Sequence, residues 1–230
     1  MSALSDKTIR NLCEGREVGV LDIASGKAST ERNLGLCLPM IEPYVGVQKR
    51  TMVVERQIDG VTISDEVPIL SFGQSSMGYD VRVCRDGLKL FTNAHGSVID
   101  PRKPAASCYV EPIIHKNPEG LEYFLIPPNS YALAPTPEHF RIPRDVIVIC
   151  LGKSTYARSG VAINVTPIEP GFEGNVVIEI ANQTNLPVMI YLDQGIAQFV
   201  FIKGDDECDV SYGDRGGKYM HQTGMTLSKV

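Results

Sequence analysis

Residues 175–182 read NVVIEIAN, an apolar run interrupted by one acidic residue, and the run has the composition of a β-strand. Alternation along a strand places Glu179 between Val177 and Ala181 on one face, while the other face is wholly aliphatic. Glu179 is therefore expected to be partly buried rather than exposed on an edge strand. Burial of a carboxylate is costly without partners and raises its pKa, so Glu179 is a candidate for proton transfer.

Short β-branched or aromatic runs, separated by glycine, proline, asparagine or aspartate, fill the chain from about Val67 onward. This spacing predicts a mainly β fold, an all-β sandwich or barrel. Tight connections are expected at the turn-forming positions 127–129, 135–137, 170–171 and 193–195. The expected strands are 78–84, 88–91, 121–126, 130–134, 146–151, 161–165, 175–180, 187–192 and 196–202.

The N-terminal part has a different character. Residues 4–13 show helical spacing, with Ser5 and Asp6 as candidate caps, and predict a short helix. Residues 14 to about 65 are treated as an N-terminal embellishment of unknown role. It contains a polar stretch at 26–33. It also contains a possible strand pair, formed by 52–57 and 61–64.

Composition indicates an ordinary globular protein. With 230 residues, 43% hydrophobic and 21% charged, the chain can form a single domain, 1–230. The net charge of -5 argues against a nucleic-acid or membrane-surface partner. No run approaches the roughly 18 to 20 apolar residues that cross a bilayer, and the start of the sequence lacks the apolar core of a secretion signal. The expected location is the cytoplasm.

Cysteine and histidine usage predicts neither disulfides nor a metal site. The six cysteines are scattered, as reduced thiols are in a chain of this size. They form no C-x-x-C pair, and the four histidines show no metal-ligand spacing with them. We expect no zinc.

Residues 152–160 (GKSTYARSG) combine cations and hydroxyls between two glycines. Lys153 and Arg158 can balance the charge of a polyphosphate, and Ser154 and Thr155 can donate hydrogen bonds to it. The segment matches neither the Walker A spacing nor the dinucleotide glycine fingerprint.

Residues 211–230 (SYGDRGGKYMHQTGMTLSKV) lose the strand periodicity and become glycine-rich. Two readings stay open. The segment is a frayed terminus, or it is a flexible lid that closes over an anionic ligand and supplies cations and an aromatic surface.

Several blocks together resemble the dCTP deaminase family, within the trimeric dUTPase-like superfamily. They cover roughly the last two-thirds of the chain, together with SDKTIR near its start. The blocks are QSSMGYDVRV at 74–83, LIPPNSYALAPTPEHFRIP at 125–143, GKSTYARSG at 152–160, PIEPGFEGNVVIEIAN at 167–182, PVMIYLDQGIAQFVF at 187–201 and KYMHQ at 218–222.

The resemblance implies a distorted β-barrel or jelly-roll subunit, a homotrimer with active sites between subunits, and zinc-free hydrolytic deamination of dCTP to dUTP and ammonia. Glu179 would be the general base and acid, and Ser154 and Arg158 would hold the water and the carboxylate. Mg²⁺ would accompany the triphosphate. The implied substrate contacts are Lys153, Ser154, Thr155, Tyr156, Ala157 and Arg158 around the triphosphate, the backbone of Val177, Ile178 and Glu179 at the cytosine, and Glu169, Gln198, Tyr212, Lys218 and Gln222.

Two of these positions depart from the usual family pattern. Lys153 stands where arginine is more usual, which gives a point charge instead of a bidentate fork. Glu169 stands where many relatives carry an aspartate near the sugar 3′-hydroxyl. For Arg158, its place two residues after Tyr156 favours an inward direction, and for Gln198 a structural hydrogen bond and a ligand contact are equally open.

Two other functions are weighed against the deaminase. One is a dUTPase, or a bifunctional enzyme that forms dUMP directly from dCTP. The dUTPase aspartate and tyrosine are replaced here by Glu169 and Phe172, which disfavours a pure dUTPase. The other is a catalytically silent β-sandwich that senses nucleotides. A silent protein has no physical reason to keep a costly carboxylate such as Glu179 in an apolar strand.

Overall fold

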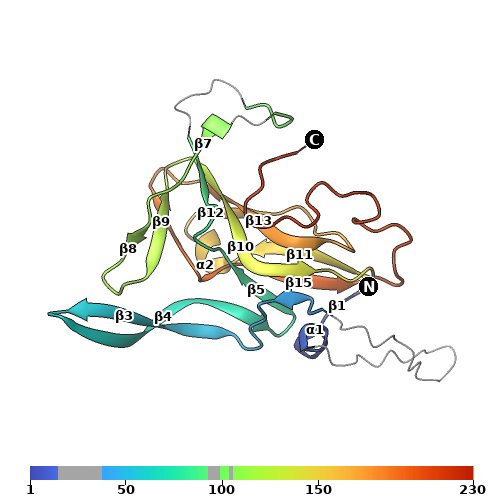
Figure 1. The fold of residues 1–230 in the computed structure, drawn as a ribbon, viewed down its shortest axis with the longest axis horizontal. Helices are drawn as coiled ribbons and strands as arrows, with labels where there is room; N and C mark the ends of the chain where they lie inside the picture. The colour runs from blue at the N-terminus through green and yellow to red at the C-terminus, as the bar shows by residue number, and fades with distance from the viewer. Residues whose placement is uncertain (15–37, 93–98, 104–105, 230) are drawn as a thin grey trace.

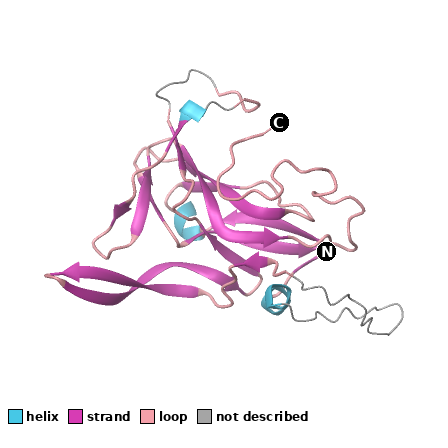
Figure 2. Ribbon diagram, viewed as in Figure 1, coloured by secondary structure: helices cyan, strands magenta, loops and turns pink. Residues whose placement is uncertain are grey.

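The computed structural model describes residues 1–14, 38–92, 99–103 and 106–229. Strands dominate this part of the chain, with one α-helix near the N-terminus, a one-turn α-helix beside the sheets and a short 3-10 helix between them in sequence (Figures 1 and 2). Cys37, His95 and the polar stretch 26–33 lie outside the described residues. Within those ranges, no helix is both long enough and apolar enough to span a membrane. Cys13, Cys84, Cys108, Cys150 and Cys208 are free thiols.

The mainly β prediction is confirmed, and each of the nine expected strands overlaps an observed strand. The helices are α1 Asp6–Glu14, η1 Ala106–Cys108 and α2 Ser154–Ala157. The strands are β1 Ser2–Ala3, β2 Ile41–Glu42, β3 Lys49–Ile58, β4 Val61–Ser75, β5 Gly78–Arg82, β6 Lys89–Phe91, β7 Tyr109–Val110, β8 His115–Lys116, β9 Glu122–Ile126, β10 Tyr131–Arg141, β11 Val146–Gly152, β12 Val161–Asn164, β13 Glu173–Asn182, β14 Val188–Tyr191 and β15 Gly195–Lys203.

The strands form three antiparallel sheets in the described part of the chain. The first has the order β1-β15-β5-β4-β3, with β11 on the other side of β15. The second has the order β12-β13-β10-β6-β7, with β2 added to β10, and the third is β14-β9-β8. Hydrogen bonds do not close them into one barrel there, so the distorted barrel consists of open sheets packed together.

The core lies between the two six-stranded sheets. Phe140 of β10 and Phe199 of β15 are fully buried, and their ring centroids are 5.2 Å apart. Ile178 and Ile180 of β13 add to the same core. Burial along β13 alternates residue by residue, as the NVVIEIAN pattern predicts.

The prediction of a tight connection at 135–137 is wrong, because β10 runs through both prolines. A register shift between Pro135 and His139 absorbs the irregularity. Thr136 repairs the ladder with its side chain: Val176 N–H donates to Thr136 Oγ1 at 3.0 Å, and this hydroxyl donates to Glu138 O at 2.7 Å. Asn175 Nδ2 donates to the carbonyls of Thr136 and Glu138, both at 3.1 Å. Side chains thus replace the backbone donors that proline lacks.

The strand pair expected in the N-terminal embellishment is confirmed and is longer than expected. β3 and β4 form a hairpin that projects beyond the other strands in Figure 1. Asp59 and Gly60 make its turn with φ of 51° and 79°, the positive values that a two-residue hairpin turn requires. The far end of β4 continues into the first sheet beside β5. The hairpin is therefore a direct extension of the first sheet.

The predicted N-terminal helix is α1, and Ser5 caps it. Thr8 N–H donates to Ser5 Oγ at 3.4 Å, and Ile9 N–H donates to Ser5 O at 3.0 Å. Ile9 and Cys13 bury the apolar side of the helix against the core.

Candidate active site

Glu179 lies inside the second sheet, because β13 is flanked by β10 and β12. Its partners across the strands are Leu133 of β10 and Asn164 of β12. The side chain is half-buried, which confirms the partial burial expected from its apolar neighbours. The edge-strand alternative is wrong.

The carboxyl group of Glu179 is held in an environment that disfavours its charge. Its Oε2 atom is buried and has no hydrogen-bond partner among the described residues. Burial raises the pKa of this carboxyl from its ordinary 4.5 to about 7. Burial, and to a smaller extent the nearby charge of Glu179, raises the pKa of the Cys150 thiol to about 12. An acid with a pKa near neutrality can both take and return a proton.

The edge of β13 beside Glu179 has a gap at Val177. On one side of this gap, β12 pairs with Glu179 and Ala181. On the other side of the gap, along the same edge, Asn175 N–H donates to Gln222 O at 2.9 Å. Alternate residues of a strand direct their backbone groups to the same edge, so Val177 directs its N–H and C=O into the interval between these contacts. The described residues record no backbone hydrogen bond for Val177 on this edge. One donor and one acceptor are thus free beside the Glu179 side chain.

Residues 152–160 form the end of β11, the helix α2 and a turn. Tyr156 anchors them: it is 4% exposed, and its hydroxyl accepts a hydrogen bond from Tyr191 N–H at 3.0 Å. Backbone N–H groups of Ala157 and Arg158 donate to the carbonyls of Lys153 and Ser154 at 3.0 Å and close the turn. The remaining side chains of this turn are exposed: Ser154, Thr155, Ala157 and Arg158.

The inward direction expected for Arg158 is wrong within a single chain. Tyr156 occupies the inward position, and two residues later the helix has turned by about 200°, which directs Arg158 outward. Over the part of the chain that the structure describes, no hydrogen bond or ion pair joins Ser154 or Arg158 to Glu179. The three expected catalytic side chains are therefore not joined by hydrogen bonds or ion pairs in the described part of one chain.

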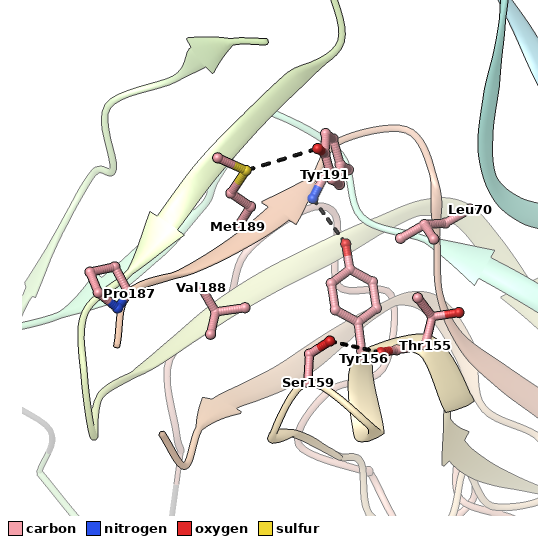
Figure 3. A pocket seen from close by; sticks show the side chains of 8 residues that line it. All are labelled: Leu70, Thr155, Tyr156, Ser159, Pro187, Val188, Met189 and Tyr191. Atoms are coloured by element: carbon pink, nitrogen blue, oxygen red, sulfur yellow. Dashed lines mark hydrogen bonds between the residues drawn. The ribbon is translucent and has the colours of Figure 1, made fainter. Parts of the chain in front are cut away.

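A pocket of about 320 Å³ lies between α2 and β14 (Figure 3). Thr155, Tyr156 and Ser159 line one side, and Val188 and Met189 line the other, with an opening to the surface between them. Its lining is mostly apolar and includes none of the expected catalytic residues. The pocket makes the surface around α2 concave and apolar. The exposed hydroxyls of Ser154 and Thr155 and the exposed Arg158 side chain lie on the same helix and turn.

Lys153, expected at the triphosphate, and Gln198, expected elsewhere in the nucleotide site, both contact Asp80, a residue that the sequence analysis missed. Lys153 Nζ lies 2.6 Å from Asp80 Oδ2, and Gln198 Nε2 donates to Asp80 Oδ1 at 3.2 Å. Gln198 Nε2 also donates to Ser75 Oγ at 3.1 Å. The structural hydrogen bond weighed for Gln198 is thus present. The available signal for Asp80 is a charged residue between Tyr79 and Val81 in a short buried strand.

Glu169 and Tyr212 meet the start of the tail. Glu169 forms an ion pair with Arg215. Tyr212 N–H donates to Pro170 O at 2.9 Å, and the Tyr212 ring packs on Phe172 with centroids 5.9 Å apart. The loop that carries Glu169 is therefore tied to the tail.

The tail is docked on its own chain, which contradicts the frayed-terminus reading for 211–229. Gln222 pairs with Gly174 as an isolated bridge, and its Nε2 donates to Asn175 O at 2.6 Å. Lys218 is exposed, and its Nζ donates to Lys229 O at 3.1 Å. Gln222 thus lies next to the open Val177 edge, whereas Lys218 lies at the surface.

The described part of the chain contains no ready-made metal centre. Among the residues that the structure covers, no group of three or more His, Cys, Asp or Glu side chains could hold a metal ion.

Comparisons with known proteins agree on one family. Residues 49–204 match the family described as dCTP deaminase-like. The dCTP deaminase of Ectopseudomonas mendocina is 50% identical over 191 residues, which cover 83% of this chain and 91% of that protein. The dCTP deaminase of Pseudomonas aeruginosa strain UCBPP-PA14 gives the same identity and coverage.

A solved structure gives a weaker likeness. The 2′-deoxycytidine 5′-triphosphate deaminase of Agrobacterium tumefaciens overlaps 59% of this chain and 44% of that chain, with a TM-score of 0.48 and 13% identity. The family match includes Glu179, α2 and Asp80, and it ends before the tail.

Proposed function

This chain belongs to the dCTP deaminase-like family, and on that premise we propose that it hydrolyses the 4-amino group of dCTP and releases dUTP and ammonia. The observation that carries the proposal is Glu179: a half-buried carboxyl with an unpartnered oxygen and a pKa near 7, beside free backbone groups of Val177. A carboxyl so placed suits a reaction in which one group takes a proton and returns it.

The proposed reaction uses Glu179 as base and then as acid. The Glu179 carboxylate takes a proton from water while the water oxygen bonds to C4 of the cytosine, and it delivers that proton to the ring nitrogen N3. The hydroxyl proton on C4 then passes through Glu179 to the amino group. The C4–N4 bond breaks with its electron pair on nitrogen, so ammonia leaves and the C4 carbonyl of uracil forms.

The cytosine would bind at the open edge of β13. The free C=O and N–H of Val177 match the donor and acceptor along the pairing edge of a cytosine, and Ile178 and Glu179 continue the same backbone. Gln222 borders this edge because it is paired with Gly174 and Asn175. Glu169 would contact the sugar hydroxyl, with Arg215 holding its carboxylate.

The triphosphate would bind at α2. Lys153 and Arg158 supply charge, and the exposed hydroxyls and backbone N–H groups of α2 supply donors. Mg²⁺ would enter bound to the triphosphate. Zinc is not part of the proposal, because the sequence contains neither the H-x-E nor the P-C-x-x-C segment of zinc deaminases. Residues from the tail complete the proposed nucleotide site: Tyr212, Lys218 and Gln222. Gln198 bonds to the Asp80 carboxylate that also holds Lys153.

The working molecule is proposed to be a cytoplasmic homotrimer of a single domain, with sites between subunits. Ser154 and Arg158 are exposed and make no hydrogen bond or ion pair with Glu179 in the described part of one chain, so in this proposal a second copy brings them to the carboxylate. Exposed apolar side chains near α2 and β14 are available for such a contact, among them Leu151 at 53% and Met189 at 45% exposure.

The test is incubation with dCTP and magnesium, followed by separation of the nucleotide products and measurement of ammonia. We expect dUTP and ammonia in equal amounts from the wild-type chain. dUMP with pyrophosphate would instead establish the bifunctional alternative, and unchanged dCTP would establish the nucleotide-sensing alternative.

A further inference from the structure

Asp80 is the centre of a buried polar cluster on β5. It is 2% exposed, and its carboxylate accepts hydrogen bonds from three side chains. Lys153 Nζ and Gln48 Nε2 donate to Oδ2 at 2.6 and 3.1 Å, and Gln198 Nε2 donates to Oδ1 at 3.2 Å. These donors come from three distant parts of the chain: the approach to β3, the start of α2, and β15.

The cluster fixes the position of Lys153 strongly. A buried carboxylate is costly to keep without a cation, and Lys153 is the cation that contacts Asp80 in the described structure. A lysine side chain otherwise samples many rotamers, and that of Lys153 is only 15% exposed. The backbone N–H of Lys153 also donates to Ile196 O at 3.2 Å. Lys153 directly precedes α2, so its position also sets where that helix begins.

The cluster leaves Lys153, but not Gln198, with hydrogen-bond donors for a phosphate. An ammonium carries three donors, and Asp80 occupies one of them, so Lys153 keeps donors for a phosphate oxygen. Gln198 Nε2 uses both of its hydrogens on Ser75 and Asp80, which leaves Gln198 without a donor for phosphate. Gln198 therefore serves as part of the frame that holds Asp80.

We propose that Asp80 is a positioning residue for polyphosphate recognition: its buried carboxylate holds Lys153 at the start of α2 in the orientation that receives the substrate triphosphate. Asp80 does not touch the nucleotide itself. This inference rests on the proposed function for the identity of the substrate, but the anion-binding role of Lys153 can be tested without any turnover.

The first test is Asp80→Asn, which keeps the side-chain shape and removes the charge. Calorimetric titration with inorganic tripolyphosphate should show about 10-fold weaker binding, the usual consequence of losing one hydrogen bond to a charged group. The KM for dCTP should rise by a similar factor, while kcat changes less than about 2-fold. A merely structural defect would lower the melting temperature without this separation of KM from kcat.

A double-mutant cycle tests whether Asp80 acts through Lys153. In a Lys153→Met background, Asp80→Asn should weaken tripolyphosphate binding no further, because the residue that Asp80 positions is already gone. Additive losses would overturn the proposal. So would a folded Asp80→Asn protein that binds tripolyphosphate as tightly as the wild type or more tightly, since Asp80 would then merely compete with the ligand for Lys153.

Two further measurements complete the design. Glu138→Gln is the matched control, because Glu138 of β10 is a fully buried carboxylate paired at 2.8 Å with Arg82, which lies on β5 like Asp80. It should lower the melting temperature and leave tripolyphosphate affinity unchanged.

If Asp80→Asn does not fold, ¹⁵N-lysine NMR of the wild-type chain decides. The Lys153 Nζ resonance should be slowly exchanging and should shift on addition of tripolyphosphate, and an unshifted resonance would overturn the proposal. Tripolyphosphate binding without dCTP turnover would leave this role intact and refute the proposed function alone.

Discussion

Glu179 is poised for proton transfer by its surroundings and not by any charged partner. The strand around it is apolar, its Oε2 atom is buried without a partner in the described structure, and burial takes its pKa to about 7. A carboxyl on an open surface would be ionised throughout the neutral range and would return a proton poorly. The gap at Val177 places free backbone groups next to this acid. Glu179 therefore combines a position beside free backbone groups with a pKa suited to proton transfer.

Glu179→Gln should lose at least about 100-fold in kcat, because the amide cannot take the proton from water. Binding of dCTP should be retained, since the amide has nearly the same shape. The measurement is ammonia release at saturating dCTP, with calorimetry for binding. Glu173→Gln, on the same strand and paired with Arg141 at 3.4 Å, is the control and should keep its activity. Near-normal ammonia release by Glu179→Gln would contradict the role.

The pH profile of kcat/KM should show a rising limb with an apparent pKa near 7. The base is active as the carboxylate, and burial raises the pKa of Glu179 from 4.5 to about 7, so the active fraction grows as the pH increases through 7. Initial rates at low dCTP between pH 5 and 9 would measure it. A limb that is complete near the ordinary pKa of 4.5 would show that the carboxyl is not desolvated in the working enzyme.

The same shift has a consequence for stability. The folded state prefers the neutral form of Glu179, so the stabilisation is fully present below pH 4.5 and is lost as the pH rises through about 7. Glu179→Gln has no ionisable group at this position, so its stability does not show this pH-dependent loss. The melting temperature of the wild type relative to the variant should therefore decline between pH 5 and 8, and parallel curves would contradict the desolvation of Glu179.

At the scale of elements, the tail lies beside the open edge of β13, because Gln222 pairs with Gly174. The tail is anchored at its start, where Arg144 bonds Asp214 at 2.8 Å and the carbonyls of Cys208 and Asp209. It is anchored again where Gln222 pairs with the beginning of β13. Between these anchors it carries Arg215 to Glu169. A segment held at two points can close over a ligand while staying attached.

Deletion of residues 213–230 should abolish turnover and leave a folded protein, because the buried core cluster lies outside this segment and, of the described residues within it, only the partly buried Tyr219 packs against that cluster. Ammonia release and the thermal unfolding transition measure the two effects. A shorter deletion of 226–230 keeps Gln222 and Arg215 and should retain most activity. Unchanged kinetic constants after the longer deletion would remove the tail from the site.

Sequence periodicity predicts the strands well because alternation reports burial, which is a local property of β13 and its neighbours. It fails at β10, where proline normally ends a strand but Thr136 and Asn175 supply the missing hydrogen bonds. The Asp80 cluster is also invisible to it, because three distant segments contribute the partners. Side-chain repair and long-range pairing leave no periodic signal.

At the scale of the whole molecule, the exposed position of Arg158 is explained if a second copy supplies it. Light scattering should give a particle of three times the 25.2 kDa chain mass. Coexpressed Glu179→Gln and Arg158→Ala chains, each inactive alone, should regain turnover in mixed trimers, in about a quarter of the sites for random mixing. The control pairs Glu179→Gln with a chain carrying both changes and should stay inactive. Failure to complement would place the complete site within one chain.

Reaction in ¹⁸O-labelled water tests the central claim most directly, since hydrolytic deamination places a solvent oxygen on the base. Mass spectrometry of the product should show one ¹⁸O at O4 of the uracil in a nucleotide that keeps all three phosphates, and the Glu179→Gln variant should form almost none of it. Label found in a phosphate or pyrophosphate, or dCTP recovered unlabelled and intact, would contradict the account.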